Sequence, residues 1–129
     1  MSKLGLDYGK KKIGLALATG SLAEVYDVIR YNNKNEALVK IGKVIDNEEI
    51  SKIVVGISEG KMAKESKDFG KLLGNSFKVE IDYHDEILTT KQAQRLSIEA
   101  GIKREKRKRM EDAYAAVLML QNYLEKPKI

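Results

Sequence analysis

The sequence has no cysteine, few aromatic residues and no long apolar run. Without cysteine, the chain has no disulfide, no thiol nucleophile and no thiolate zinc site. Aromatic residues are only 6% of the chain and do not alternate with basic ones as in single-strand binders, so we interpret Tyr8 and Tyr83 as packing residues. The longest apolar run, residues 115–120, is too short to cross a bilayer, and no signal-peptide core precedes it. These absences predict a soluble, cytoplasmic protein with no membrane partner.

The positive charge of the chain is concentrated in one short segment. The 129 residues, 43% of them hydrophobic, predict a single domain over residues 1–129 with a substantial core. The net charge is +5, and residues 103–109, KREKRKR, hold this excess because acids and bases balance elsewhere. Such a segment indicates contact with a polyanion, although a solvated basic loop has the same composition.

Residues 3–18, KLGLDYGKKKIGLALA, form the pattern of a β-hairpin. Its first strand contains Asp7 at a position where burial disfavours a charge. An ionised carboxylate in a sheet needs a partner or a metal ion, so Asp7 is a candidate site residue, the alternative being an Asp that caps the turn. One face of the second strand has only small residues, which leaves room for a packed helix or a ligand site.

The rest of the chain alternates between strand and helix patterns. Asn35 is a plausible cap for the first helix, Gly74 a stop for the second, and Thr89 with Gln92 a capping box for the third. We expect a third strand at residues 25–31, a helix at 35–47, a buried parallel strand at 52–57, a helix at 63–73, an edge-like strand with one wet face at 77–83, and helices at 89–100 and 110–125. Strands linked by helices after an antiparallel start predict a mixed sheet covered on both faces.

Acidic residues stand at several positions where the patterns do not require them. Asp85 and Glu86 follow the fifth expected strand, and Asp112 lies on the small-residue face of the last helix. Convergence with Asp7 would suit hard divalent cations, and two such ions can activate water for phosphodiester hydrolysis. Separately, Asp85 can cap a turn, Glu86 can pair with a lysine and Asp112 can complement its helix N-terminus. The neighbouring His84 could be a general acid or a structural residue.

Four segments together resemble the YqgF/RuvX family of Holliday-junction-resolvase-like proteins: LGLDYGKKKIGLALA, VVGI, DEILTTKQAQ and EDAYAAVLMLQNYL. The resemblance runs nearly the full chain. It implies an RNase H-like α/β fold whose five-stranded mixed sheet has the order third, second, first, fourth, fifth strand, with helices on both faces. It also implies a nuclease that uses Mg²⁺ or Mn²⁺, two ions with substrate, and matures the 5′ end of pre-16S rRNA, with a pre-ribosomal particle as a partner.

The resemblance assigns roles to individual residues. Asp7, Glu86 and Asp112 match the family's catalytic acids and would be its metal ligands, and Lys11 matches its lysine after the glycine turn. With the basic segment, the expected nucleic-acid contacts are Lys11, Lys12, Lys103, Arg104, Lys106, Arg107, Lys108 and Arg109.

The chain departs from the family pattern in places. Ile87 stands where the family has an arginine that could hold a phosphate bidentately, and Lys12 stands where arginine is usual. The loop after VVG is short, and its Glu59 is either a replacement ligand or a solvated acid. The alternatives are therefore a Holliday junction resolvase acting on DNA, or a noncatalytic RNA-binding module of ribosome assembly.

Overall fold

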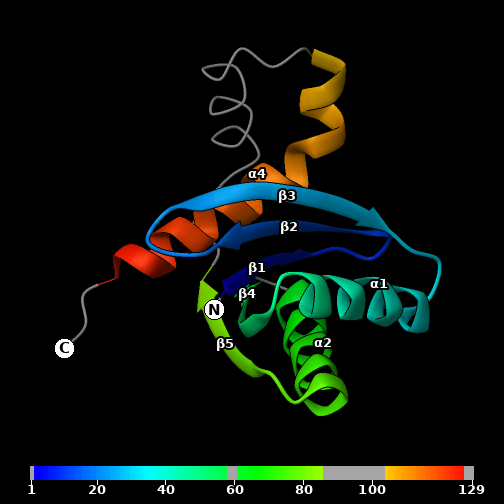
Figure 1. Ribbon diagram of the computed structural model, residues 1–129. Helices are drawn as coiled ribbons and strands as arrows, with labels where there is room; N and C mark the ends of the chain where they lie inside the picture. Colours follow the sequence, from blue (N-terminus) through cyan, green and yellow to red (C-terminus); the bar gives the residue numbers. More distant parts are fainter. Residues whose placement is uncertain (1, 58–60, 86–103, 127–129) are drawn as a thin grey trace.

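The structure is a computed structural model that describes residues 2–57, 61–85 and 104–126. Its elements in chain order are β1 (Ser2–Tyr8), β2 (Lys12–Ala18), β3 (Ala23–Arg30), α1 (Lys34–Asn47), β4 (Ile50–Ile57), α2 (Lys61–Phe77), β5 (Glu80–Asp85) and α4 (Arg104–Glu125) (Figure 1). The sheet has the order β3-β2-β1-β4-β5. β2 is antiparallel to β1 and β3, whereas β4 is parallel to β1 and β5. The expected mixed sheet and its strand order are confirmed.

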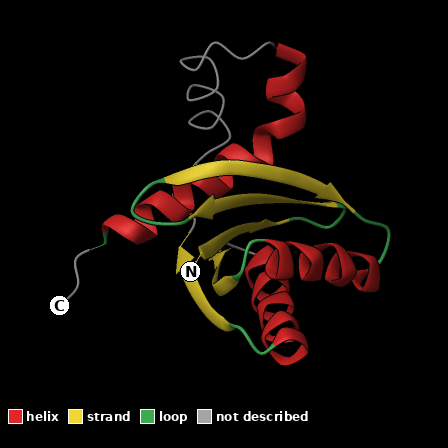
Figure 2. Ribbon diagram, viewed as in Figure 1, coloured by secondary structure: helices red, strands yellow, loops and turns green. Residues whose placement is uncertain are grey.

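Helices cover both faces of this sheet, as the sequence predicted. α1 and α2 lie on one face and α4 lies on the other (Figure 2). Leu4 and Leu6 of β1 are fully buried on the first face, in one core cluster with Ile41 of α1 and Phe69 of α2. A second cluster on the opposite face joins residues of β2, β3 and β4 to α4. Residues of β1 that alternate with Leu4 and Leu6 therefore point toward α4.

Glycines on the sheet let α4 approach closely. A Cβ added to Gly5 would lie 2.8 Å from the Cβ of Leu120, and one added to Gly56 would lie 3.3 Å from the Cγ of Met119. Both distances are tighter than ordinary packing, so larger side chains would push the helix away. The small face of the second strand was predicted to admit a helix or a ligand site, and Ala16 and Ala18 on it pack against α4.

The third strand differs from its expected form because of a β-bulge. β3 runs from Ala23 to Arg30, so Tyr31 lies just beyond it. The pairing with β2 shifts between Leu15, opposite Asp27, and Ala16, opposite Val25. The extra residue resets the alternation of side chains, which leaves Val25 36% exposed.

The three helices that the structure describes all begin earlier than the sequence patterns predicted, α2 at Lys61 instead of residue 63. The cap of α1 is Asn33, not Asn35: its side chain accepts a hydrogen bond of 2.9 Å from the backbone N–H of Glu36. α4 begins at Arg104 instead of Met110, so most of the basic segment is helical rather than a loop. Figure 1 shows these first turns projecting beyond the sheet. The expected helix at 89–100 lies outside the described residues.

The boundary between α2 and β5 was also predicted incorrectly. α2 continues past Gly74 to Phe77, and the strand begins at Glu80. The Phe77 ring packs where a Cβ on Gly42 of α1 would be 2.8 Å away, so this aromatic residue serves the helix layer and not the sheet. Lys78 ends the helix with a positive φ of 53° and donates its N–H to the carbonyl of Gly74.

β4 is the buried parallel strand that its apolar run predicted, and β5 is an edge strand as expected. Among the described residues, no helix is long and apolar enough to cross a membrane.

Candidate active site

Asp7 lies near the end of β1 on the face that α4 covers. It is paired in register with Gly14 of β2, and directly opposite residues of an antiparallel pair point to the same face. The side chain of Asp7 is half-buried. Because Gly14 has no side chain, another element can approach the sheet closely beside Asp7.

The backbone of Asp112 in α4 fills the space over Gly14. A Cβ added to Gly14 would lie 2.0 Å from the carbonyl oxygen of Asp112 and 2.6 Å from the backbone nitrogen of Ala113. The helix is therefore in direct contact with the strand neighbour of Asp7. Two of the predicted acids, separated by most of the chain, thus lie at the same end of the same face of the sheet.

The Asp112 carboxylate lies beside a lysine of the hairpin. Its Oδ2 is 3.1 Å from Nζ of Lys12, and the two side chains are 28% and 41% exposed. The Oδ2 atom itself is buried and accepts no hydrogen bond from the described residues, because the lysine approaches without hydrogen-bond geometry. A buried carboxylate oxygen with only a charge contact can still accept a further ligand.

The lysine-rich turn between β1 and β2 is held from the side by Tyr31. The Tyr31 hydroxyl donates a hydrogen bond to the carbonyl of Gly9, and the Tyr31 N–H donates to the carbonyl of Lys11. Burial raises the pKa of Tyr31, so its hydroxyl remains a proton donor. The predicted nucleic-acid contact Lys11 is exposed on this turn, while Lys12 contacts Asp112.

His84 is held by α4. It lies opposite Gly56 in the pairing of β4 with β5, and its Nε2 is 2.6 Å from Oδ1 of Asn122. Its ring also meets the Tyr123 ring edge to face, with centroids 5.7 Å apart. These contacts support the structural role for His84. The next residue, Asp85, is exposed at the end of β5.

Several predicted site residues lie outside the described part of the chain. These are the third acid Glu86, its neighbour Ile87, the loop acid Glu59 and Lys103. Residues 104–109 belong to α4, but the positions of their side chains are not described. The convergence of Asp7, Glu86 and Asp112 therefore stays a prediction, and the described residues alone form no group of three potential metal ligands.

A polar chain at the opposite end of α4 was missed by the sequence patterns. Tyr123 donates its hydroxyl proton to Oδ2 of Asp82 at 2.6 Å and accepts a hydrogen bond from Nζ of Lys52 at 3.3 Å. The bond from Tyr123 lowers the pKa of Asp82, with further help from the N–H of Tyr83 and nearby lysines. The separate hydrogen bond that Lys52 donates to the Tyr123 hydroxyl raises the pKa of Lys52.

The strand pattern of residues 77–83 predicts one wet face, and Asp82 in this strand is reached by Tyr123 from the end of α4. Strand periodicity gives no signal for this contact, because the partner comes from a helix 41 positions further along the chain.

The topology and the solved structures it resembles define an RNase H-like fold. RuvC of Thermus thermophilus in complex with a Holliday junction substrate superposes with a TM-score of 0.64 at 15% identity, covering 96% of this chain and 93% of RuvC. The Holliday junction resolvase of fowlpox virus gives a TM-score of 0.66 at 9% identity, covering 97% of this chain and 98% of the resolvase.

The chain belongs to the RuvX family, whose sequence model is described as Holliday junction resolvase and matches residues 1–126. Among its relatives is a protein of Oenococcus oeni named "Putative pre-16S rRNA nuclease", 39% identical over 98% of this chain and 95% of the relative. A relative of the same name from Lactococcus lactis is 37% identical over 95% of this chain and 92% of its own length. The resemblance found in the sequence is confirmed.

Proposed function

We propose that the protein is a divalent-metal-dependent endonuclease that hydrolyses nucleic-acid phosphodiesters. The observation that carries this proposal is the contact between Gly14 and the backbone of Asp112, which brings a second acid to the end of the sheet where Asp7 lies. Family membership and the names of the relatives agree with it. Glu86, one position after the described end of β5, is the proposed third acid.

The described residues fit a hard cation at this position. The buried Oδ2 of Asp112 accepts no hydrogen bond from the described residues, and carboxylate oxygens are the ligands that Mg²⁺ and Mn²⁺ prefer. Asp7, Glu86 and Asp112 would hold two ions when substrate is bound. Bound ions would polarise the scissile phosphate and lower the pKa of the attacking water.

The other residues position the substrate. Lys12 offsets the charge of Asp112 in the absence of substrate, and its half-exposed ammonium is available to a phosphate oxygen arriving at the same place. The exposed Lys11 extends this positive edge along a turn that Tyr31 holds in place. Residues 104–109 form the first turns of the helix that carries Asp112, and together with Lys103 their basic side chains would guide a polyanion toward acids that otherwise repel it.

The substrate we propose is RNA rather than DNA: the 5′ end of the pre-16S rRNA, met on a pre-ribosomal particle. The names of the relatives favour this substrate. The description of the family and the structural neighbours favour a second candidate, a four-way DNA junction.

The test is cleavage of three substrates by the purified protein: RNA spanning the 5′ end of 16S rRNA, a four-way DNA junction and linear duplex DNA. Each is incubated with Mg²⁺, with Mn²⁺ and with a chelator. The proposal expects specific cuts in RNA that require the metal. Cutting of the four-way DNA junction alone would show that the protein is a junction resolvase. Tight binding to RNA without cutting, with either metal, would show that it is a noncatalytic RNA-binding module.

A further inference from the structure

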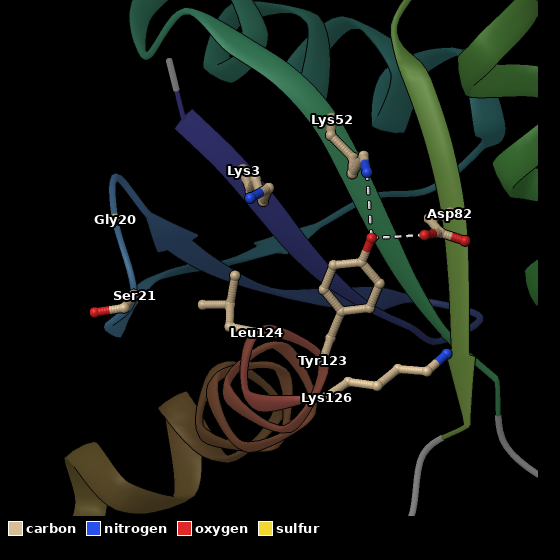
Figure 3. A pocket seen from close by; sticks show the side chains of 8 residues that line it. All are labelled: Lys3, Gly20, Ser21, Lys52, Asp82, Tyr123, Leu124 and Lys126. Atoms are coloured by element: carbon tan, nitrogen blue, oxygen red, sulfur yellow. Dashed lines mark hydrogen bonds between the residues drawn. The ribbon is translucent and has the colours of Figure 1, made fainter. Parts of the chain in front are cut away.

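A pocket lies beside the C-terminal end of α4, near the start of β1, whereas Asp7 lies near the end of that strand. Its volume is about 410 Å³, within the size range of small-ligand sites. It is bounded by the first residues of β1 and β4, by β5, by the turn that follows β2, and by the end of α4 (Figure 3). The lining residues are Lys3, Gly20, Ser21, Lys52, Asp82, Tyr123, Leu124 and Lys126.

Three lysines and one acid give this pocket a positive charge. Lys3 and Lys52 are paired in register on β1 and β4, so two like charges lie on neighbouring strands. Adjacent like charges in a sheet are destabilising unless something compensates them. Lys52 has Tyr123 at 3.3 Å and Glu80 at 3.7 Å. The half-buried Lys3 makes no side-chain hydrogen bond or ion pair with any residue that the structure describes.

The acid in the pocket is already engaged. Oδ2 of Asp82 accepts from Tyr123, and Oδ1 accepts from the N–H of Tyr83 at 3.0 Å. Figure 3 shows the hydroxyl of Tyr123 between Lys52 and Asp82, while the side chain of Lys126 extends toward β5. Asp82 therefore fixes the positions of Tyr123 and Lys52, and the ammonium groups of Lys3 and Lys126 remain for an incoming anion.

We infer that this pocket binds a phosphate group of the nucleic acid, at a point remote from the cleaved bond. Lysine ammonium groups bind phosphate as point charges, and the pocket holds three of them against one carboxylate. The inference rests on the proposed function for the identity of the ligand. The pocket would fix the substrate at one end of α4 while the acids lie at the other.

The spacing gives the inference a length that can be measured. Lys3 precedes Asp7 by four residues on β1, which corresponds to about 13 Å at about 3.3 Å per strand residue. Each strand of a DNA duplex rises about 3.4 Å per nucleotide, so in a substrate with a comparable helical rise the second phosphate lies about four nucleotides from the scissile bond. Shorter flanks on that side would leave the pocket empty.

The first experiment measures affinity for RNA substrates whose flank grows from two to eight nucleotides on either side of the cleavage site, with a chelator present to prevent cutting. The expected result for the wild type is an increase of about tenfold once one flank exceeds about four nucleotides, the size of one charge-assisted contact. The double variant Lys3→Gln/Lys126→Gln should lose this step. The matched control Lys43→Gln/Lys71→Gln removes two exposed lysines from α1 and α2 and should keep it. Equal flank dependence in both double variants would overturn the inference.

The second experiment does not depend on the nuclease assignment. Inorganic phosphate is titrated into the wild type and into both double variants, and the amide resonances of residues lining the pocket are followed by NMR. We expect saturable shifts in the wild type and the control that are lost in Lys3→Gln/Lys126→Gln. No shifts in the wild type would refute the phosphate site. Shifts with inorganic phosphate but no dependence of RNA affinity on flank length would show that the pocket binds phosphate but not a phosphate group of the nucleic acid. A wild type that binds phosphate and long flanks but cuts nothing would refute the proposed function alone.

Discussion

Gly14 of β2 touches the backbone of Asp112 in α4 so closely that an added Cβ would lie 2.0 Å from the Asp112 carbonyl oxygen. Gly14 is also the strand partner of Asp7. One glycine therefore determines how near the helix, and the acid it carries, can come to the acid of the first strand.

Gly14→Ala should lower the free energy of unfolding by about 3 kcal/mol or more, at the upper end of overpacking effects, because backbone atoms and not a flexible side chain stand in the way. Urea denaturation measures this. Gly20→Ala is the control, since a Cβ there meets nothing within 4 Å and should change the value by less than about 0.5 kcal/mol. Equal stability of the two variants would show that α4 is not fixed by this contact.

Asp7→Asn should abolish cleavage and leave the fold intact. The substitution keeps the size of the side chain but removes the charge that a metal ion requires. It can even increase stability, because repulsion among nearby carboxylates is relieved. Cleavage rates and unfolding curves are compared with those of Asp46→Asn, which changes an exposed acid on α1. A near wild-type rate for Asp7→Asn would mean that Asp7 is structural.

Lys12→Gln should have little effect on folding. Its ion pair with Asp112 is substantially exposed, and such pairs contribute at most about 1 kcal/mol. The free energy of RNA binding should decrease by more than the free energy of unfolding, because the lysine is proposed to contact a phosphate of the RNA. Denaturation and RNA titration of the same samples test both parts. A large loss of stability with unchanged RNA affinity would show that Lys12 stabilises the fold and does not contact the substrate.

The basic segment should control the salt dependence of binding. Changing Lys106, Arg107, Lys108 and Arg109 to Gln should reduce the slope of log affinity against log salt by up to about 0.7 for each lost single-strand phosphate contact. Gln is preferred to Ser because the segment is helical, and Gln retains helix propensity. Turnover of bound substrate should change little. An unchanged slope would assign substrate entry to another surface, such as the turn at Lys10 to Lys12.

Tyr123→Phe should weaken the pH dependence of stability in acid. The hydrogen bond from Tyr123 lowers the folded-state pKa of Asp82 below its ordinary value of 3.8. The unfolded chain therefore binds the proton first as pH falls, so this stability is present above about pH 4 and is lost as pH falls through the folded-state pKa. Unfolding free energies between pH 2 and 7 should show a smaller acid-range decrease in the variant. Tyr114→Phe is the control on the same helix. An equal change in this control would show that the pH dependence does not come from the bond between Tyr123 and Asp82.

The sequence predicted the parts of this molecule that depend on local pattern. Leu4 and Leu6 identified a strand, and Asp7 and Asp112 were noticed because each interrupts an apolar or small-residue pattern. The same reasoning placed the end of α2 at Gly74, where the helix in fact continues and the Phe77 ring packs on Gly42. A glycine that permits close packing cannot be distinguished by sequence from one that ends a helix.

Other features depend on contacts between distant segments. The bulge opposite Leu15 and Ala16 shifts the exposed face of β3 and follows from pairing, not from the composition of either strand. The contact of Tyr123 with Asp82 requires that α4 cross the sheet at a particular angle. Periodicity within a strand or helix has no information about that crossing.

The order in which these segments are synthesised has a consequence for the cell. β1 and β2 pair as a local hairpin, whereas α4 reaches them only after roughly a hundred further residues, a separation that makes such contacts slow to form. A growing chain on the ribosome therefore contains Asp7 long before Asp112. If both acids are required for the proposed cleavage, the emerging protein cannot cut the RNA of the ribosome that makes it until α4 has docked.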